Sequence, residues 1–348
     1  MESYVYFKFS FHVFFVRCSS LYELELNRLV NVVRRLGASR ILIQFPEGLK
    51  PYASKIASAA NSVNAIPIVL ADPCYGGCDV AFMEAKALNI DLIVHYGHTE
   101  MVNGEIPVVY FEARMNLPIL NTVRKAVPLL SDYKRIGLAS TVQHIHKLSS
   151  IKDFLEKEGF QVFIGESSGF GVKYKGQILG CNYSPLRSIK DNIDAILLVG
   201  SRFHGVGARI AVYKPTIVAD PYTNSAYNVD ELASKLLKIR YANILEAKES
   251  KCFGVILGLK PGQMRMHLAL KALNMLKSAG REAYIIAARE INPEVLAGFD
   301  VDAYVNTACP RISLDDAKRF KKPIITFKEL LVVLNEISWE ELLTGGWF

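Results

Sequence analysis

The chain has 348 residues, of which 51% are apolar and 22% are charged, so it can bury a core large enough for two or three domains. Its formal net charge of +7 is spread along the chain, and no basic cluster is dense enough to indicate a nucleic-acid groove. We therefore expect no nucleic-acid partner.

Six cysteines occur without a secretory signal, which favours a reducing compartment, here the cytoplasm, over a disulfide framework. Residues 1–20 form a separate segment with an aromatic run from Tyr4 to Val16, interrupted by Lys8 and His12. This run is shorter than the roughly 20 apolar residues that a membrane span requires. We interpret it as an edge strand or an apolar extension, and we expect no membrane association.

From residue 21 to 130, short apolar runs alternate with helical patterns, which is typical of a parallel, Rossmann-like unit. The predicted strands are 41–45, 65–70, 92–96 and 108–111, and the predicted helices are 21–36, 51–60 and 80–88.

The same order of elements recurs in residues 131–228 and again in residues 229–348. The second unit has predicted strands at 136–139, 161–164, 195–199 and 216–219. The third begins with a long charged helix, about 229–248, and has predicted strands at 253–257, 283–287, 303–305 and 323–327. The sequence therefore predicts an α/β protein of three tandem Rossmann-like domains with parallel sheets, whose equivalent ends face one central site in a pseudo-threefold arrangement.

The loop 71–79 carries Cys74 and Cys78 between a predicted strand and a predicted helix, the place where α/β proteins hold reactive groups. The helix dipole is expected to favour a thiolate at Cys78. A Cys-x3-Cys pair also occurs by chance, because buried free cysteine is common.

Cys78, Cys181 and Cys309 each follow an apolar run, one in each unit. Three thiolates without a nearby histidine or carboxylate pattern favour a soft metal centre. An iron–sulfur cluster held by three cysteines leaves one iron free for a substrate. The alternative is three unrelated buried thiols, and we interpret Cys18 and Cys252 in that way.

Six motifs resemble those of the archaeal diphthamide-synthesis enzymes, the 2-(3-amino-3-carboxypropyl)histidine synthases, over about residues 25–335. They are residues 44–49 (QFPEGL), 75–79 (YGGCD), 95–98 (HYGH), 220–222 (DPY), 258–263 (GLKPGQ) and 308–313 (ACPRIS). Cys74 lies outside the family pattern, as an incidental thiol, a spare ligand or a redox-sensitive site. Ala81 stands where the Cys-x3-Cys-x2-Cys pattern of ordinary radical S-adenosylmethionine enzymes would continue.

The resemblance implies a 4Fe-4S cluster held by Cys78, Cys181 and Cys309, a homodimer, and an external electron donor. It also implies S-adenosylmethionine as substrate and translation elongation factor 2 as acceptor. The expected reaction is reductive cleavage of the bond between sulfur and Cγ of S-adenosylmethionine, after which the 3-amino-3-carboxypropyl radical adds to the imidazole C2 of one histidine. This is the first step of diphthamide biosynthesis.

Candidate substrate-binding residues lie in loops beyond the predicted strands. The loop 258–263 is expected to open a helix and offer its amides to a carboxylate or a ribose oxygen. The candidates are Gly258, Lys260, Gly262, Gln263, His98, Gln143, His204 and Arg311, together with His144. A solvated charge at Lys260 and structural histidines are the alternatives.

Three other functions compete with this hypothesis. The first is an iron–sulfur dehydratase of the quinolinate synthase type, in which the open iron acts as a Lewis acid. The second is a non-catalytic subunit that keeps the fold and supports a catalytic partner. The third, a plain nucleotide-binding scaffold, leaves the positions of the three cysteines unexplained.

Overall fold

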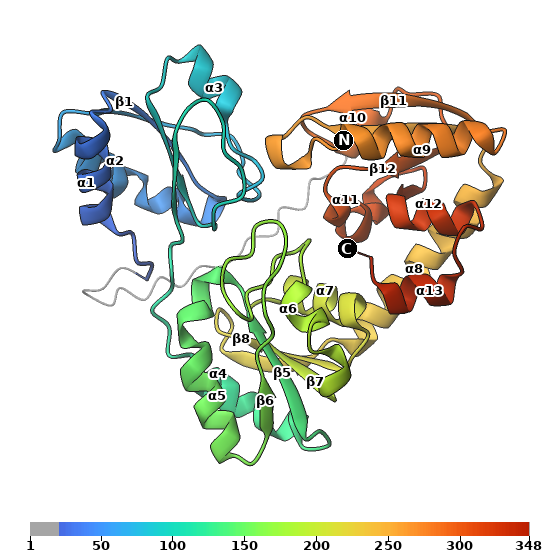
Figure 1. The fold of residues 1–348 in the computed structure, drawn as a ribbon, viewed down its shortest axis with the longest axis horizontal. Coiled ribbons are helices and arrows are strands. Elements are labelled where there is room, and N and C mark those ends of the chain that lie inside the picture. Colours follow the sequence, from blue (N-terminus) through green and yellow to red (C-terminus); the bar gives the residue numbers. More distant parts are fainter. Residues whose placement is uncertain (1–20, 348) are drawn as a thin grey trace, which may run out of the picture.

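The computed structural model describes residues 21–347 and contains three α/β lobes at the corners of a triangle (Figure 1). Each lobe is built on one sheet, and the sheets are mainly parallel. The predicted fold class is therefore confirmed. The interpretation of residues 1–20, and that of Cys18 within them, lies outside the described residues.

The first sheet has the strand order β2-β1-β3-β4 and is parallel throughout. Its strands are β1 (Arg40–Gln44), β2 (Ile66–Val69), β3 (Leu92–Tyr96) and β4 (Val108–Phe111). The accompanying helices are α1 (Leu26–Leu36), η1 (Glu47–Tyr52), α2 (Ala53–Asn61) and α3 (Phe82–Ala87). Strands β1 and β3 are central and almost wholly buried, because their apolar runs pack on both faces.

The second sheet has the order β6-β5-β7-β8-β9. Its strands are β5 (Arg135–Ser140), β6 (Gln161–Phe163), β7 (Ala195–Val199), β8 (Thr216–Asp220) and β9 (Ser225–Asn228). The helices are α4 (Ile119–Ala126), η2 (Val127–Leu130), η3 (Val142–Lys147), α5 (Leu148–Lys157), α6 (Ser184–Arg187), η4 (Lys190–Asn192) and α7 (Arg202–Val212). Strand β9 is antiparallel and was not predicted, because its short polar sequence carries no apolar run.

Helix α4 packs on the second sheet, although the predicted boundary at residue 130 assigned it to the first unit. It contacts β8 and β9. Its buried residues Ile119, Val123 and Ala126 share one core with Leu138 and Ile217 of that sheet. We therefore propose that the second unit begins before α4.

The third sheet has the order β11-β10-β12-β13 and is parallel. Its strands are β10 (Cys252–Gly258), β11 (Glu282–Ala288), β12 (Ala303–Asn306) and β13 (Ile324–Thr326). The helices are α8 (Asp230–Glu249), η5 (Pro261–Gln263), α9 (Met266–Ser278), α10 (Pro293–Leu296), α11 (Pro310–Asp315), η6 (Ala317–Arg319), α12 (Phe327–Val333) and α13 (Trp339–Gly345). No helix within residues 21–347 combines the length and the apolar character that crossing a bilayer demands.

A fully buried ion pair joins α8 to α12. Arg240 Nη2 lies 2.6 Å from Glu329 Oε2, and both side chains are wholly excluded from solvent. Arg240 also donates hydrogen bonds to the carbonyl oxygens of Ser313 and Ile324. Because Ser313 belongs to α11, which starts directly after Cys309, this pair fixes the helix that follows the third cysteine.

Candidate metal and substrate site

Cys78 lies in the loop between β2 and α3, in direct contact with a loop of the third unit. The Gly262 amide donates a hydrogen bond to the Cys78 carbonyl at 2.8 Å, and Gln263 Nε2 donates one to Cys78 Sγ at 3.4 Å. A Cβ on Gly262 would lie only 2.6 Å from the Cys78 Cβ, so the close approach requires glycine. The first cysteine is thus held by two units at once.

Cys181 lies in the second unit, in the loop between β6 and α6, and Cys309 directly precedes α11 of the third unit. Burial, together with the neighbouring Cys309 and Cys78, raises the pKa of Cys181 to about 12. Burial likewise raises the pKa of Cys309, and Cys78 adds to this effect. The structure therefore brings the three predicted cysteines, one from each unit, within electrostatic range of one another.

These three thiols fit an iron–sulfur cluster. Because burial raises the pKa of these thiols, all three can be ionised together only when a cationic centre accompanies them. Arg265 and Arg311 supply part of that positive charge, since both lower the pKa of Cys181 and of Cys309. An all-sulfur donor set is the one that iron–sulfur clusters use.

The expected effect of the α3 dipole on Cys78 is not what the structure shows. Burial and the charge of Asp79 raise the pKa of the Cys78 thiol, and the Gln263 hydrogen bond, the Cys78 backbone and Lys260 lower it only in part. Helix α3 begins at Phe82 and has six residues, so it starts beyond Cys78 and has a small dipole. A thiolate at Cys78 therefore depends on a bound cation rather than on the helix.

The loop 258–263 does not open the long helix, contrary to the prediction. It ends in the single turn η5, and α9 starts only at Met266, because Met264 and Arg265 have non-helical backbone angles. The amides of Leu259, Gly262 and Gln263 already donate to backbone carbonyls. These three amides are therefore committed within the protein.

Lys260 is buried and is not a solvated loop charge. Its amino group lies 3.0 Å from Asp79 Oδ2 and 2.9 Å from Glu290 Oε1. It also lies 4.4 Å from the centre of the Tyr75 ring. Lys260 thus ties the third unit to the cysteine loop of the first.

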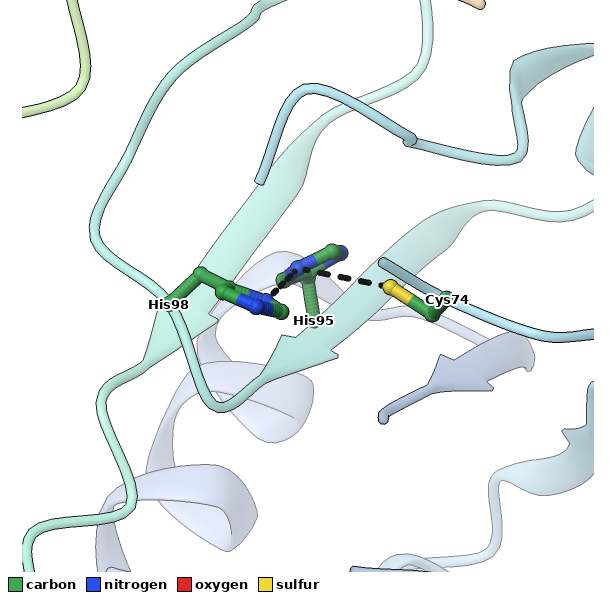
Figure 2. A group of neighbouring side chains, drawn as sticks. All are labelled: Cys74, His95 and His98. Carbon is green, nitrogen blue, oxygen red and sulfur yellow. Dashed lines mark hydrogen bonds between the residues drawn. The ribbon is translucent and has the colours of Figure 1, made fainter. Parts of the chain in front are cut away.

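His98 lies beside two residues whose grouping was not predicted. Its Nδ1 is 2.9 Å from His95 Nε2, and Cys74 Sγ is 4.0 Å from the same nitrogen of His95 (Figure 2). His95 was counted as part of an apolar strand, which hid its role. The His-x-x-His spacing at 95–98, taken together with Cys74, was the available signal.

The remaining candidates surround the strand ends of the second unit. Gln143 Nε2 donates a hydrogen bond to the Gly97 carbonyl of the first unit at 2.7 Å. Burial, together with nearby Arg311 and His144, lowers the pKa of His204 to about 3. Arg311 pairs with Asp315 at 2.6 Å and stacks on Phe203, with its guanidinium carbon 3.6 Å from the ring centre.

His144 is a fully buried histidine whose ring nitrogens have no hydrogen-bond partner among the described residues. Burial lowers its pKa to about 4. Buried polar atoms without partners are costly in a native protein, so such a group is a candidate to meet a ligand. In the sequence, His144 is one of several histidines that follow predicted strands, and nothing there distinguishes it from the others.

Comparison with known proteins agrees with this geometry. A model of the family described as "Putative diphthamide synthesis protein" matches residues 45–343. The chain belongs to this family. The 2-(3-amino-3-carboxypropyl)histidine synthase of Pyrococcus horikoshii is 35% identical over 93% of this chain and 95% of its own length. Subunit 1 of the synthase from Schizosaccharomyces pombe is 30% identical over 92% of this chain and 76% of its own length.

A solved structure of a family member also matches. The crystal structure of Dph2 from Pyrococcus horikoshii with a 4Fe-4S cluster has a TM-score of 0.85 and 34% identity, covering 92% of this chain and 93% of that one. The predicted family is confirmed. The names of these relatives agree with a transferase, and the cluster in the crystal structure agrees with the predicted cofactor.

Proposed function

We propose that this chain transfers the 3-amino-3-carboxypropyl group of S-adenosylmethionine to one histidine of translation elongation factor 2, the first step of diphthamide biosynthesis. The observation that carries the proposal is the meeting of Cys78, Cys181 and Cys309 from three units. Membership of the diphthamide synthesis family supports the same reaction. When bound by these cysteines, a 4Fe-4S cluster would supply the electron that cleaves the bond between sulfur and Cγ, releasing methylthioadenosine.

The residues of the chain have three tasks in this reaction: they hold the cluster, orient the sulfonium and exclude water. The thiols are buried, and Arg265 and Arg311 provide positive charge that favours their ionised form. Gln263 fixes Cys78 through its hydrogen bond. The third and first units are locked together at this point by Lys260 and Asp79.

His144 and His204 offer uncharged hydrogen-bonding groups at neutral pH, because burial lowers the pKa of both rings. An uncharged imidazole can bind the amino or carboxylate group of the substrate without repelling the positive sulfonium. We assign Arg311 to the same region, since it lies close enough to His204 to lower the pKa of that ring. Its positive charge would attract the substrate carboxylate.

The proposal includes the partners that the reaction needs. An external electron donor must reduce the cluster, and elongation factor 2 must present its histidine at the open side of the site. We further propose a homodimer acting in the cytoplasm, where the factor and a reducing environment are found.

An anaerobic assay tests the proposal directly. Reduced, cluster-loaded protein is incubated with elongation factor 2 and carboxyl-labelled S-adenosylmethionine. We expect label on the factor and an equal amount of methylthioadenosine. The Cys181→Ala variant should lose both products together with most of its iron, whereas Cys252→Ala, in a cysteine far from the three, should keep them.

Two other outcomes of this assay would contradict the proposed transferase and favour a different function. Full iron content with neither labelled factor nor methylthioadenosine would favour a dehydratase of the quinolinate synthase type. A chain that binds no iron after anaerobic purification, or one that keeps its cluster in all three cysteine variants, would favour a non-catalytic subunit.

A further inference from the structure

Cys74, His95 and His98 form a second group of metal-type ligands, beside the three cysteines but separate from them. One ligand atom of each residue lies within 4.8 Å of one ligand atom of the other two. Cys74 comes from the loop after β2, His95 from β3, and His98 from the loop after β3 (Figure 2). Cys74 and His95 are buried, whereas His98 is partly exposed.

The orientation of the His95 ring is set by Gln44, a buried residue of β1. Gln44 Nε2 donates to the Asp79 carbonyl at 2.7 Å, and the Ala81 amide donates to Gln44 Oε1 at 3.2 Å. These two hydrogen bonds fix which end of the amide faces His95. The oxygen therefore lies 3.3 Å from His95 Nδ1, and a carbonyl oxygen only accepts.

His95 thus carries its proton on Nδ1, and its Nε2 lone pair points toward His98 and Cys74. A histidine that donates one ring N–H to a fixed oxygen while presenting the other nitrogen is the usual arrangement of a metal ligand. Gln44 plays the part of the outer residue that holds the ring.

We propose that Cys74, His95 and His98 bind a zinc-type divalent cation. One sulfur and two imidazole nitrogens are a donor set that zinc prefers. Three protein ligands leave a fourth position, which solvent fills on the partly exposed side of His98.

Two of the three separations between ligand atoms are close to those that tetrahedral coordination needs. Zinc bond lengths place two nitrogen ligands about 3.3 Å apart and a nitrogen and a sulfur about 3.6 Å apart. Here the two histidine nitrogens are 2.9 Å apart, and Cys74 Sγ is 4.0 Å from His95 Nε2. These two separations change by about 0.4 Å on binding. The third, between Cys74 Sγ and the His98 ligand nitrogen, is within 4.8 Å and closes to about 3.6 Å when the side chains rotate.

The bound cation would fasten the cysteine loop to the end of β3. Cys74 lies four residues before Cys78, so its anchoring limits the movement of the loop that carries the first cluster ligand. The inference does not require the transferase activity, because its test measures zinc and not turnover.

The test is a metal analysis of the cluster-loaded protein. The protein is dialysed anaerobically against buffered zinc, and zinc and iron per chain are measured together by mass spectrometry. We expect one zinc per chain with no loss of iron. Cys74→Ser and His98→Ala should weaken zinc binding by more than tenfold, since even loss of an outer residue costs about 10- to 100-fold. Gln44→Leu removes such an outer residue, so it should weaken zinc binding by about 10- to 100-fold.

Two matched controls should bind zinc like the unaltered chain: Cys252→Ala and His267→Ala, which change a cysteine and an exposed histidine elsewhere. X-ray absorption of the unaltered protein should show one sulfur and three nitrogen or oxygen neighbours around zinc, two of them imidazole nitrogens, which decides the question even if a variant fails to fold. Equal zinc binding in all variants, zinc gained only as iron is lost, or a sulfur-only shell would overturn the proposal.

Discussion

Gln263 and Cys78, which are 185 residues apart in the sequence, are joined by a hydrogen bond from the side-chain amide to the cysteine sulfur at 3.4 Å. Hydrogen bonds to ligand sulfur stabilise the more negative, reduced state of a cluster. We therefore predict that Gln263→Leu lowers the reduction potential of the bound cluster, on the order of tens of millivolts. A redox titration followed by electron paramagnetic resonance measures the change.

Met264→Leu is the matched control for this variant, since Met264 is adjacent and exposed. It should leave the potential unchanged. An unaltered potential in Gln263→Leu would show that the amide only positions the loop.

Gly262→Ala should push the third unit away from Cys78. The added Cβ would lie 2.7 Å from the Cys78 Cα, which is backbone and cannot move aside cheaply. We expect a loss of about 1–3 kcal/mol in the free energy of unfolding, together with lower iron content. Chemical denaturation and iron analysis measure these effects. Gly298→Ala, where the new Cβ meets nothing within 4 Å, should be close to neutral, and equal effects of the two variants would refute the prediction.

Arg240 and Glu329 form a buried ion pair, and removing one of the two side chains leaves the charge of the other uncompensated. Arg240→Met should therefore lower the free energy of unfolding by about 3–5 kcal/mol. It should also reduce iron content, because Arg240 holds the carbonyl of Ser313 in the helix that follows Cys309. Denaturant unfolding of the purified variant gives the magnitude.

The double variant Arg240→Met/Glu329→Leu is the informative comparison. Replacing both charges by apolar groups removes the unpaired carboxylate, so most of the lost stability should return. A double variant as unstable as the single one would mean that the hydrogen bonds of the two side chains, from Arg240 to Ser313 and Ile324 and to Glu329 from Thr326 and Trp347, outweigh the unpaired charge.

Acidification should destabilise the protein through His144 and His204. Their pKa values in the folded state are about 4 and about 3, below the ordinary value near 6.5 of the unfolded chain. Below pH 6.5 the unfolded chain binds more protons than the folded chain. The free energy of unfolding therefore decreases as the pH decreases, by up to about 1.4 kcal/mol per pH unit for each histidine.

Denaturant unfolding at several pH values between 7 and 4 measures this slope. His144→Gln and His204→Gln should each make it shallower, whereas His267→Gln, at an exposed position, should not. Identical slopes in all four proteins would count against buried neutral rings.

The local part of the fold follows from the sequence, since apolar runs such as β3 (Leu92–Tyr96) have the length and flanking signals of buried strands. The antiparallel strand β9 was missed, because its pairing with β8 depends on register and not on hydrophobic pattern. The predicted boundary at residue 130 places helix α4 in the first unit, whereas the helix packs on the second sheet. A helical pattern indicates an apolar face, but it does not say which sheet covers that face.

The approach of Cys78, Cys181 and Cys309 to one another could be predicted from the sequence, because each unit carries one of them after an apolar run, while their role as cluster ligands stays a prediction. Other contacts between the units could not be predicted from the sequence. Nothing near Lys260 in the sequence indicates its pairing with Asp79, and the residues of the Cys74 group are spread over two strand ends. Such groupings depend on how strands are ordered in a sheet, which periodicity does not encode.

Because each unit carries one of the three thiols, the cluster site can form only after the cysteine of every unit has been synthesised. Under the proposed ligand set, Cys309 leaves the ribosome last, so a nascent or truncated chain that lacks it offers only two of the three sulfurs. Cofactor insertion then waits until residue 309 has been made and the three lobes have docked, and iron loading in the cell reports on correct assembly.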